Sequence, residues 1–162
     1  MQYTEQHNQI QDALRKFIDS RGESLAHGWR NMLADLQAGN VRMTDPDGFE
    51  VGGNLATTPG AVIFRNRLLE VIHYAPTQPQ VHAEPVVIVT PWINKFYILD
   101  LNPKKSLVKY LTDQGFAVFI TSWKNPTPEM RDVTFEDYLV EGVSAAIEAA
   151  RGFAGVEQVH AV

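Results

Sequence analysis

Two short runs of purely apolar residues constrain the fold of this chain more than any other feature. Residues 86–89 and 116–120 are apolar at every position rather than at alternate positions. Such runs are typical of strands that are covered on both faces, as in a parallel sheet. Both runs fit within about 35 residues, the size of one strand–helix–strand unit. We therefore expect an α/β fold with a mostly parallel sheet.

The residues around these two runs predict further elements of the sheet. Asn102 and Pro103 suit the N-cap and first turn of a helix, and Gly115 suits its end. This predicts a helix of about three turns between the two strands. A third strand is predicted at 69–74, where β-branched and aromatic residues are frequent.

Two amphipathic helices should precede the sheet. Apolar residues recur at steps of three and four in 4–19 and again in 23–38. A passage rich in turn-forming residues follows at 44–48. We expect a helical segment at 1–40 and an α/β core at 41–162.

The last third of the chain predicts a long helix and a final strand. Thr134 and Asp137 resemble a capping box, and an apolar stripe continues from there to Ala150. Residues 159–162 are typical of a strand. Because this strand has no successor in the sequence, we expect an incomplete sheet.

Composition excludes several classes of function. The net charge of −5 provides no basic surface for nucleic acid. No stretch reaches the roughly 20 apolar residues of a membrane span, and the N-terminus does not resemble a secretory signal, so we expect a cytoplasmic protein. The absence of cysteine excludes disulfides and any thiol nucleophile within these residues. The five histidines lack the spacing of metal motifs, and we expect neither a metal nor a cofactor.

Three stretches, in this order, resemble polyhydroxyalkanoate synthases: Asn54–Val62, Pro91–Leu101 and Ser122–Pro126. Each stretch alone is a weak signal, and their order makes the resemblance specific. The resemblance implies the front portion of an α/β-hydrolase-type core. It also implies an acyltransferase that polymerises (R)-3-hydroxyacyl groups from coenzyme A thioesters with a Cys-Asp-His triad and no metal.

In this family a Gly-x-Cys-x-Gly-Gly box follows a strand that resembles Val159–Val162. The sequence contains neither this box nor the later triad residues. We therefore expect the parent protein to be an enzyme and the isolated chain to be inactive. The resemblance further implies as partners an (R)-3-hydroxyacyl-CoA substrate, the growing polyester and a second copy in a homodimer, at polyester granules in the cytoplasm.

The loop Pro91–Asn94 is the strongest candidate site. In α/β-hydrolase-type folds, one oxyanion-hole amide comes from the loop after an early central strand. The resemblance points to the backbone amides of Trp92 and Ile93. Alternatively, the loop is an ordinary turn with Trp92 in the core.

Side chains that follow this loop could line a substrate channel. Asn94, Tyr97 and Asp100 are the candidates for substrate binding. The alternative for Asp100 is that it only terminates a turn.

Other hypotheses stay open or are rejected. Gly142–Ala146 half-matches the esterase motif, but the second glycine is absent and Ser144 lies in a predicted helix, which argues against a serine nucleophile. A non-catalytic binding or scaffolding module that shares the front of the fold is the alternative function. The first two helices, with Phe17 and Trp29, either meet a partner or granule surface or pack on their own core.

Overall fold

The computed structural model describes residues 2–39, 41 and 47–162, with side chains from residue 9 onward. The chain divides into two compact units, Met1–Gly48 (unit 1) and Phe49–Val162 (unit 2). The turn predicted at 44–48 falls largely outside the described residues, and the boundary predicted after residue 40 stays a prediction.

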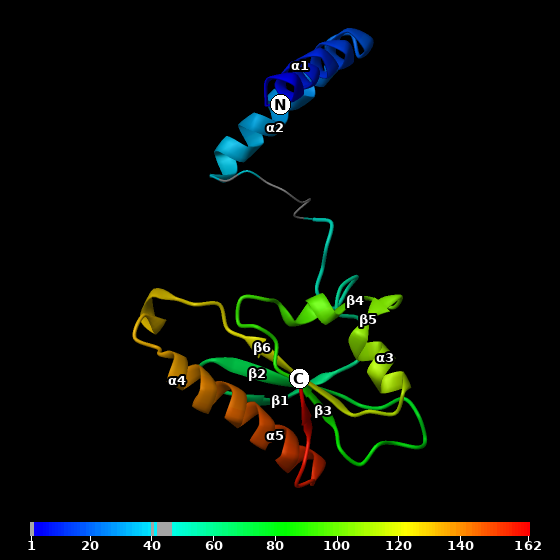
Figure 1. Cartoon of the computed structure of the whole chain (residues 1–162), viewed down its shortest axis with the longest axis vertical. Helices are drawn as coiled ribbons and strands as arrows, with labels where there is room; N and C mark the ends of the chain where they lie inside the picture. Colours follow the sequence, from blue (N-terminus) through cyan, green and yellow to red (C-terminus); the bar gives the residue numbers. More distant parts are fainter. Residues whose placement is uncertain (1, 40, 42–46) are drawn as a thin grey trace. The chain divides into compact units, whose positions relative to one another are not determined.

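Unit 1 is a hairpin of two helices, as predicted. α1 spans Gln2–Asp19 and α2 spans Glu23–Ala38 (Figure 1). Arg21 and Gly22 reverse the chain between them, with φ values of 50° and 88°. This is the left-handed region that glycine adopts readily. Within the unit, Phe17 and Trp29 stay 42% and 56% exposed, so neither packs into a core there.

Unit 2 contains a five-stranded sheet with the order β1-β2-β6-β3-β7. The strands are β1 (Ala61–Arg65), β2 (Leu69–Tyr74), β3 (Val86–Ile88), β6 (Val118–Trp123) and β7 (His160–Ala161). β6, β3 and β7 are parallel neighbours, whereas β1 pairs with β2 and β2 with β6 in antiparallel fashion.

The sheet is therefore mixed, and the prediction of a mostly parallel sheet is corrected. The two apolar runs predicted only β3 and β6, which are parallel to each other. β1 and β2 are antiparallel because Asn66 closes a tight turn between them: its side-chain oxygen accepts the N–H groups of Leu68 and Leu69 at 2.9 and 3.0 Å. β1 was not predicted, and its residues are exposed or only half-buried.

Helices cover both faces of the sheet (Figure 1). One face contributes Val71, Val87 and Phe119 to a core beneath the long helical segment that ends with α5. The other contributes Ile72, Ile88 and Ile120 to a core beneath α3 and the short η1 helix (Phe96–Leu99). Val86–Ile88 is thus buried on both sides, as the apolar run predicted.

The helix between β3 and β6 begins later than predicted. α3 spans Leu107–Asp113, about two turns, and Ser106 is its N-cap through a 2.8 Å bond from the Lys109 amide. The side chain of Asn102 instead accepts the amides of Lys104 and Lys105 in the turn between β4 (Asp100–Asn102) and β5 (Lys105–Ser106). Asparagine is frequent both at helix caps and in turns, and Asn102 occupies a turn. β6 also starts and ends later than the apolar run 116–120.

The capping box is confirmed. Thr134 and Asp137 exchange hydrogen bonds at the start of α4 (Phe135–Asp137). The helix then continues as a π-helical segment, η3 (Tyr138–Ser144), and as α5 (Ala145–Ala154). Ser144 lies exposed in η3, away from any strand-to-helix turn. The 3₁₀ turn η2 (Pro128–Met130) precedes this segment.

Candidate functional site

The carboxyl ends of the three parallel strands meet at one edge of the sheet. The Val89 amide donates to the Val162 carbonyl at 2.9 Å, which holds the end of β7 beside the end of β3. The Thr90 hydroxyl donates to the Thr121 carbonyl, and both residues are buried away from solvent. In open α/β sheets, ligands bind at this edge.

The loop Pro91–Asn94 leaves β3 at this edge. The Asn94 amide donates to the Pro91 carbonyl at 2.9 Å and closes a tight turn. The amides of Trp92 and Ile93 donate to no acceptor within the part of the chain that the structure describes. Their residues are 48% and 81% exposed. Two consecutive backbone N–H groups are thus available to an incoming oxygen atom.

Trp92 does not enter the core, contrary to the alternative of an ordinary buried turn. Its ring meets Phe135 edge-on at 5.8 Å between centroids and lies 5.4 Å from Tyr138. These rings, together with Trp123, border a hollow of about 200 Å³. The complete lining is Val89, Thr90, Pro91, Trp92, Trp123, Phe135, Tyr138, Leu139 and Val143. We call it the strand-end pocket.

The indole of Trp123 forms a fixed wall of the strand-end pocket. Its Nε1–H donates to the Thr90 carbonyl at 2.5 Å, and its ring lies 5.6 Å from that of Tyr138. A Cβ atom at Gly142 would lie 2.6 Å from Trp123 Cη2, so only glycine lets η3 approach the indole this closely. π-helical segments are frequent at functional sites.

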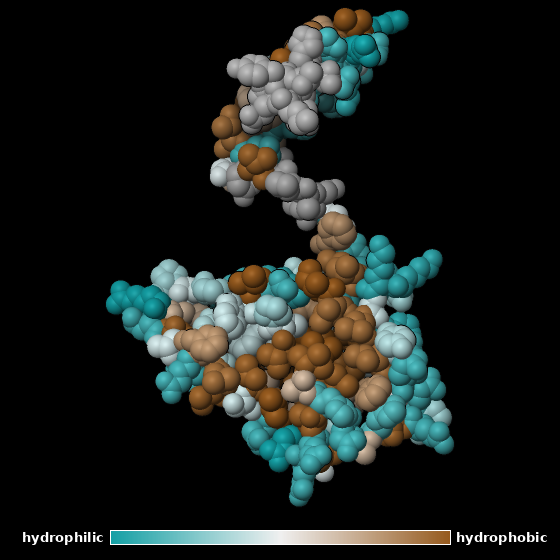
Figure 2. Space-filling view, viewed as in Figure 1, coloured by the Kyte–Doolittle hydropathy of each residue, from teal (hydrophilic) through white to brown (hydrophobic). Residues whose placement is uncertain are grey.

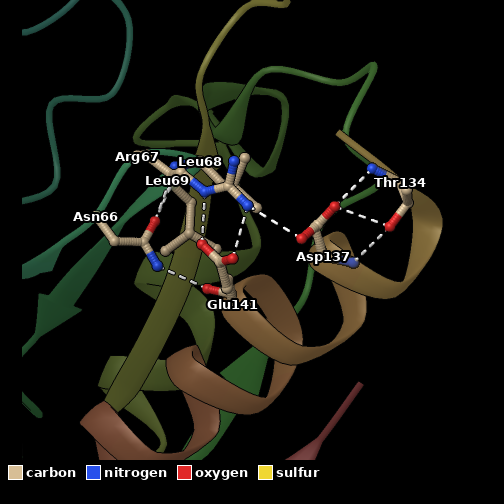
Figure 3. Close-up of polar contacts among 7 residues, drawn as sticks. All are labelled: Asn66, Arg67, Leu68, Leu69, Thr134, Asp137 and Glu141. Carbon is tan, nitrogen blue, oxygen red and sulfur yellow. Dashed lines mark hydrogen bonds and ion pairs between the residues drawn. The ribbon is translucent and has the colours of Figure 1, made fainter. Parts of the chain in front are cut away.

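A polar network ties η3 to the turn between β1 and β2 (Figure 3). The Arg67 guanidinium donates to both carboxylate oxygens of Glu141, at 2.7 and 2.6 Å, and to Asp137 at 3.0 Å. The Asn66 side chain donates to the Glu141 carbonyl at 2.6 Å. The hydrogen bond from Arg67 lowers the pKa of Glu141, and bonds from Thr134, followed by Arg67, lower the pKa of Asp137. Both carboxylates are therefore ionised at neutral pH.

The three predicted substrate-binding side chains differ in burial and in their partners. Asn94 is exposed in the loop, and Tyr97 is half-buried in η1 against Phe96. Asp100 is 1% exposed, and its carboxylate accepts the amide and the hydroxyl of Thr58 at 3.2 and 2.7 Å. The structure thus gives Asp100 an internal partner, and a role of these residues in substrate binding stays a prediction.

Other chemical groups of the described residues are dispersed. Within residues 2–39, 41 and 47–162, three or more potential metal ligands do not gather anywhere. The ring of His73 lies 4.8 and 4.6 Å from those of Phe119 and Phe153, and burial lowers its pKa. Within the same residues, no helix has the length and apolar character of a membrane span.

Sequence reasoning missed most of the residues that shape the strand-end pocket. Trp123 belongs to the stretch Ser122–Pro126, for which the sequence left open a pocket wall or a structural loop, whereas Phe135, Tyr138 and Leu139 were placed only as parts of a helix or its apolar stripe. A usable signal was present: Trp92 and Trp123 follow the two apolar runs closely in the sequence, and Phe135 and Tyr138 lie next to the capping-box residues. Gly142 inside a predicted helix was a second signal, because a glycine there indicates close packing.

Comparison with known proteins gives one consistent result. Residues 5–111 match the family described as "Poly-beta-hydroxybutyrate polymerase (PhaC) N-terminus". A poly(3-hydroxyalkanoate) polymerase subunit PhaC from Cupriavidus necator is 45% identical over 92% of this chain and 25% of its own length. A poly(3-hydroxyalkanoate) polymerase from Methylorubrum extorquens is 48% identical over 85% of this chain and 23% of its own length. The chain thus spans about a quarter of the length of these relatives.

Proposed function

Because this chain belongs to the poly(3-hydroxyalkanoate) polymerase family, we propose that it is the N-terminal part of the catalytic region of such a polymerase, built on an α/β-hydrolase-type core. The parent enzyme would be an acyltransferase that joins (R)-3-hydroxyacyl groups from coenzyme A thioesters into polyester and releases coenzyme A. The growing polyester, a second copy in a homodimer and a cytoplasmic location at polyester granules belong to the same proposal.

The chain would contribute electrostatic stabilisation rather than the nucleophile. The sequence contains no cysteine, so another part of the parent enzyme supplies the thiolate in this proposal. When the thiolate attacks the thioester carbon, the carbonyl oxygen becomes negative. A preorganised N–H group lowers the energy of this oxyanion because it faces the developing charge without reorganising.

One observation carries the proposal: the unpaired amides of Trp92 and Ile93 lie at the end of β3, directly beside β7. In this fold the nucleophile sits on a turn that follows a central strand, and an early-strand loop supplies one oxyanion donor. If β7 leads to the nucleophile, both groups meet at the same sheet edge. The Val89–Val162 bond holds the two strand ends in register.

The test removes one amide hydrogen in the full-length parent polymerase. Ile93→Pro deletes the donor, whereas Ile93→Val keeps it and changes little volume. Losing one oxyanion donor typically costs about 10²–10³ in turnover. We expect the proline variant to lose this factor in kcat while the valine variant stays near wild type.

Folding is controlled independently, because proline also restricts the loop. Circular dichroism and the dissociation constant of a non-reactive thioether analogue should match wild type before turnover is compared. A folded Ile93→Pro enzyme with wild-type kcat would show that Ile93 is not the donor, and Trp92→Pro would then be tested in the same way.

The alternative function, a binding or scaffolding module without catalysis, predicts a different result. A module of that kind would release no coenzyme A from 3-hydroxybutyryl-CoA even within its full-length parent. Release of coenzyme A by the parent, together with its loss in Ile93→Pro, would exclude this alternative.

A further inference from the structure

We propose that the strand-end pocket receives the alkyl side chain of the 3-hydroxyacyl group and thereby selects the length of the acyl chain that is polymerised. This inference rests on the proposed acyltransferase function and adds a specificity site to it. The pocket adjoins the candidate oxyanion loop, because Trp92 contributes both an unpaired amide to the loop and its ring to the pocket lining.

The chemistry of the pocket lining favours an alkyl group. Aromatic and aliphatic side chains provide most of the lining. The two buried polar side chains of the lining, Trp123 and Thr90, already have hydrogen-bond partners. Trp123 Nε1 donates to the Thr90 carbonyl, and the Thr90 hydroxyl donates to the Thr121 carbonyl. Apart from the hydroxyl of the partly exposed Tyr138, the side chains of the lining offer a polar ligand no bonds to replace those it would lose to water, which is unfavourable. An alkyl chain has no such cost and gains from burial.

The size of the pocket restricts what it can receive. A hollow of about 200 Å³ is smaller than the roughly 300–1,000 Å³ of sites that enclose a whole drug-sized ligand. It can therefore hold a short side chain of the acyl group but not the coenzyme A moiety.

The walls of the pocket are held firmly enough to discriminate by length. Trp123 is fixed by its hydrogen bond to Thr90 and by contact with Gly142. η3, which carries Leu139 and Val143, is anchored through Glu141 to Arg67 (Figure 3). A pocket that cannot expand penalises each methylene that does not fit, by about 10–200-fold in kcat/KM.

Leu139 and Val140 offer a matched pair for the test. Both lie in η3 and are 50% and 56% exposed, but only Leu139 lines the pocket. The experiment measures kcat/KM of the full-length polymerase for 3-hydroxybutyryl-CoA and 3-hydroxyhexanoyl-CoA. Leu139→Ala enlarges the pocket and Leu139→Trp fills it, while Val140→Ala and Val140→Trp are the controls.

We expect Leu139→Ala to raise the preference for the hexanoyl over the butyryl substrate about tenfold, and Leu139→Trp to lower it by a similar factor. The Val140 variants should keep the wild-type ratio. Equal ratios in all five proteins would overturn the proposal. So would Leu139 variants that lose stability without a change in the ratio, because an apolar side chain of the parent would then occupy the pocket.

This test separates the inference from the proposed function. If wild-type parent enzyme releases coenzyme A from neither substrate, the acyltransferase function itself fails. If it releases coenzyme A but the ratio is insensitive to Leu139, only the specificity site is refuted.

Discussion

Replacing Gly142 by alanine should destabilise unit 2, because the added methyl group has no space. The new Cβ would lie 2.6 and 2.7 Å from Cη2 and Cζ3 of Trp123. Contacts below 3.0 Å force one partner to move. Trp123 cannot move freely, since it is 8% exposed and donates to the Thr90 carbonyl.

The expected magnitude follows from three opposing effects. Overpacking of a core costs about 1–3 kcal/mol. Loss of the Trp123 hydrogen bond, if the indole rotates, adds about 0.5–1.5 kcal/mol. Replacing glycine by alanine within a helix stabilises the folded state by about 0.5–1 kcal/mol, which opposes these two losses. We expect a net loss of about 1–3 kcal/mol in the free energy of unfolding.

Gly152 provides the control within the same helical segment. No atom lies within 4 Å of a Cβ added there, so Gly152→Ala should be neutral or stabilise by about 0.5 kcal/mol. The assay is urea unfolding followed by circular dichroism. A second measurement repeats Gly142→Ala in a Trp123→Leu background, where the clash is absent and the destabilisation should disappear. Equal effects at Gly142 and Gly152, or an unchanged loss without Trp123, would refute the steric reasoning.

Three further predictions follow from other contacts. Thr58→Val should cost about 1–3 kcal/mol, measured by urea unfolding, because it leaves the buried Asp100 carboxylate without its hydroxyl partner, whereas Thr58→Ser should not. Burial lowers the pKa of His73 from 6.5, so the stability it contributes is present above pH 6.5 and is lost as pH falls through the folded pKa. The pH dependence of unfolding should therefore weaken in His73→Phe. The 162-residue chain should form no covalent adduct with radiolabelled 3-hydroxybutyryl-CoA, because it has no cysteine, and labelling near one per chain would contradict this.

The fold was predictable where a local pattern decides the structure. The periodicity of α1 and α2, the doubly buried run of β3 and the capping box at Thr134 all depend on neighbours within a few residues. The predicted start of α3 was wrong for a local reason, because Asn102 suits a turn as well as a helix cap. The antiparallel half of the sheet was not predicted because the apolar stretch 61–64 of β1 was not interpreted as a strand, and because its direction relative to β2 depends on the turn at Asn66.

For the candidate site, the sequence indicated the loop and, as one of two alternatives, a pocket wall at Ser122–Pro126. The motif around Pro91–Asn94 identified the loop, but which of its amides lack a partner depends on the turn that Asn94 closes. The strand-end pocket needs residues that are distant in sequence: Trp123 and Thr90 are 33 positions apart. The periodicity of neighbouring residues does not predict a contact between residues so far apart in the sequence.

Unit 2 also exposes a hydrophobic surface that these contacts leave uncovered. Figure 2 shows apolar side chains gathered around the C-terminal end of the chain. In unit 2, Ile93 and Val162 are 81% and 77% exposed. Large exposed apolar surfaces mark places where another part of a protein binds. Val162 is hydrogen-bonded to Val87 and Val89 at the end of β3, so a segment of the parent enzyme that covered Val162 would approach the same sheet edge as the loop Pro91–Asn94. In the proposed function, covering this surface and completing the oxyanion site would therefore involve neighbouring parts of the enzyme.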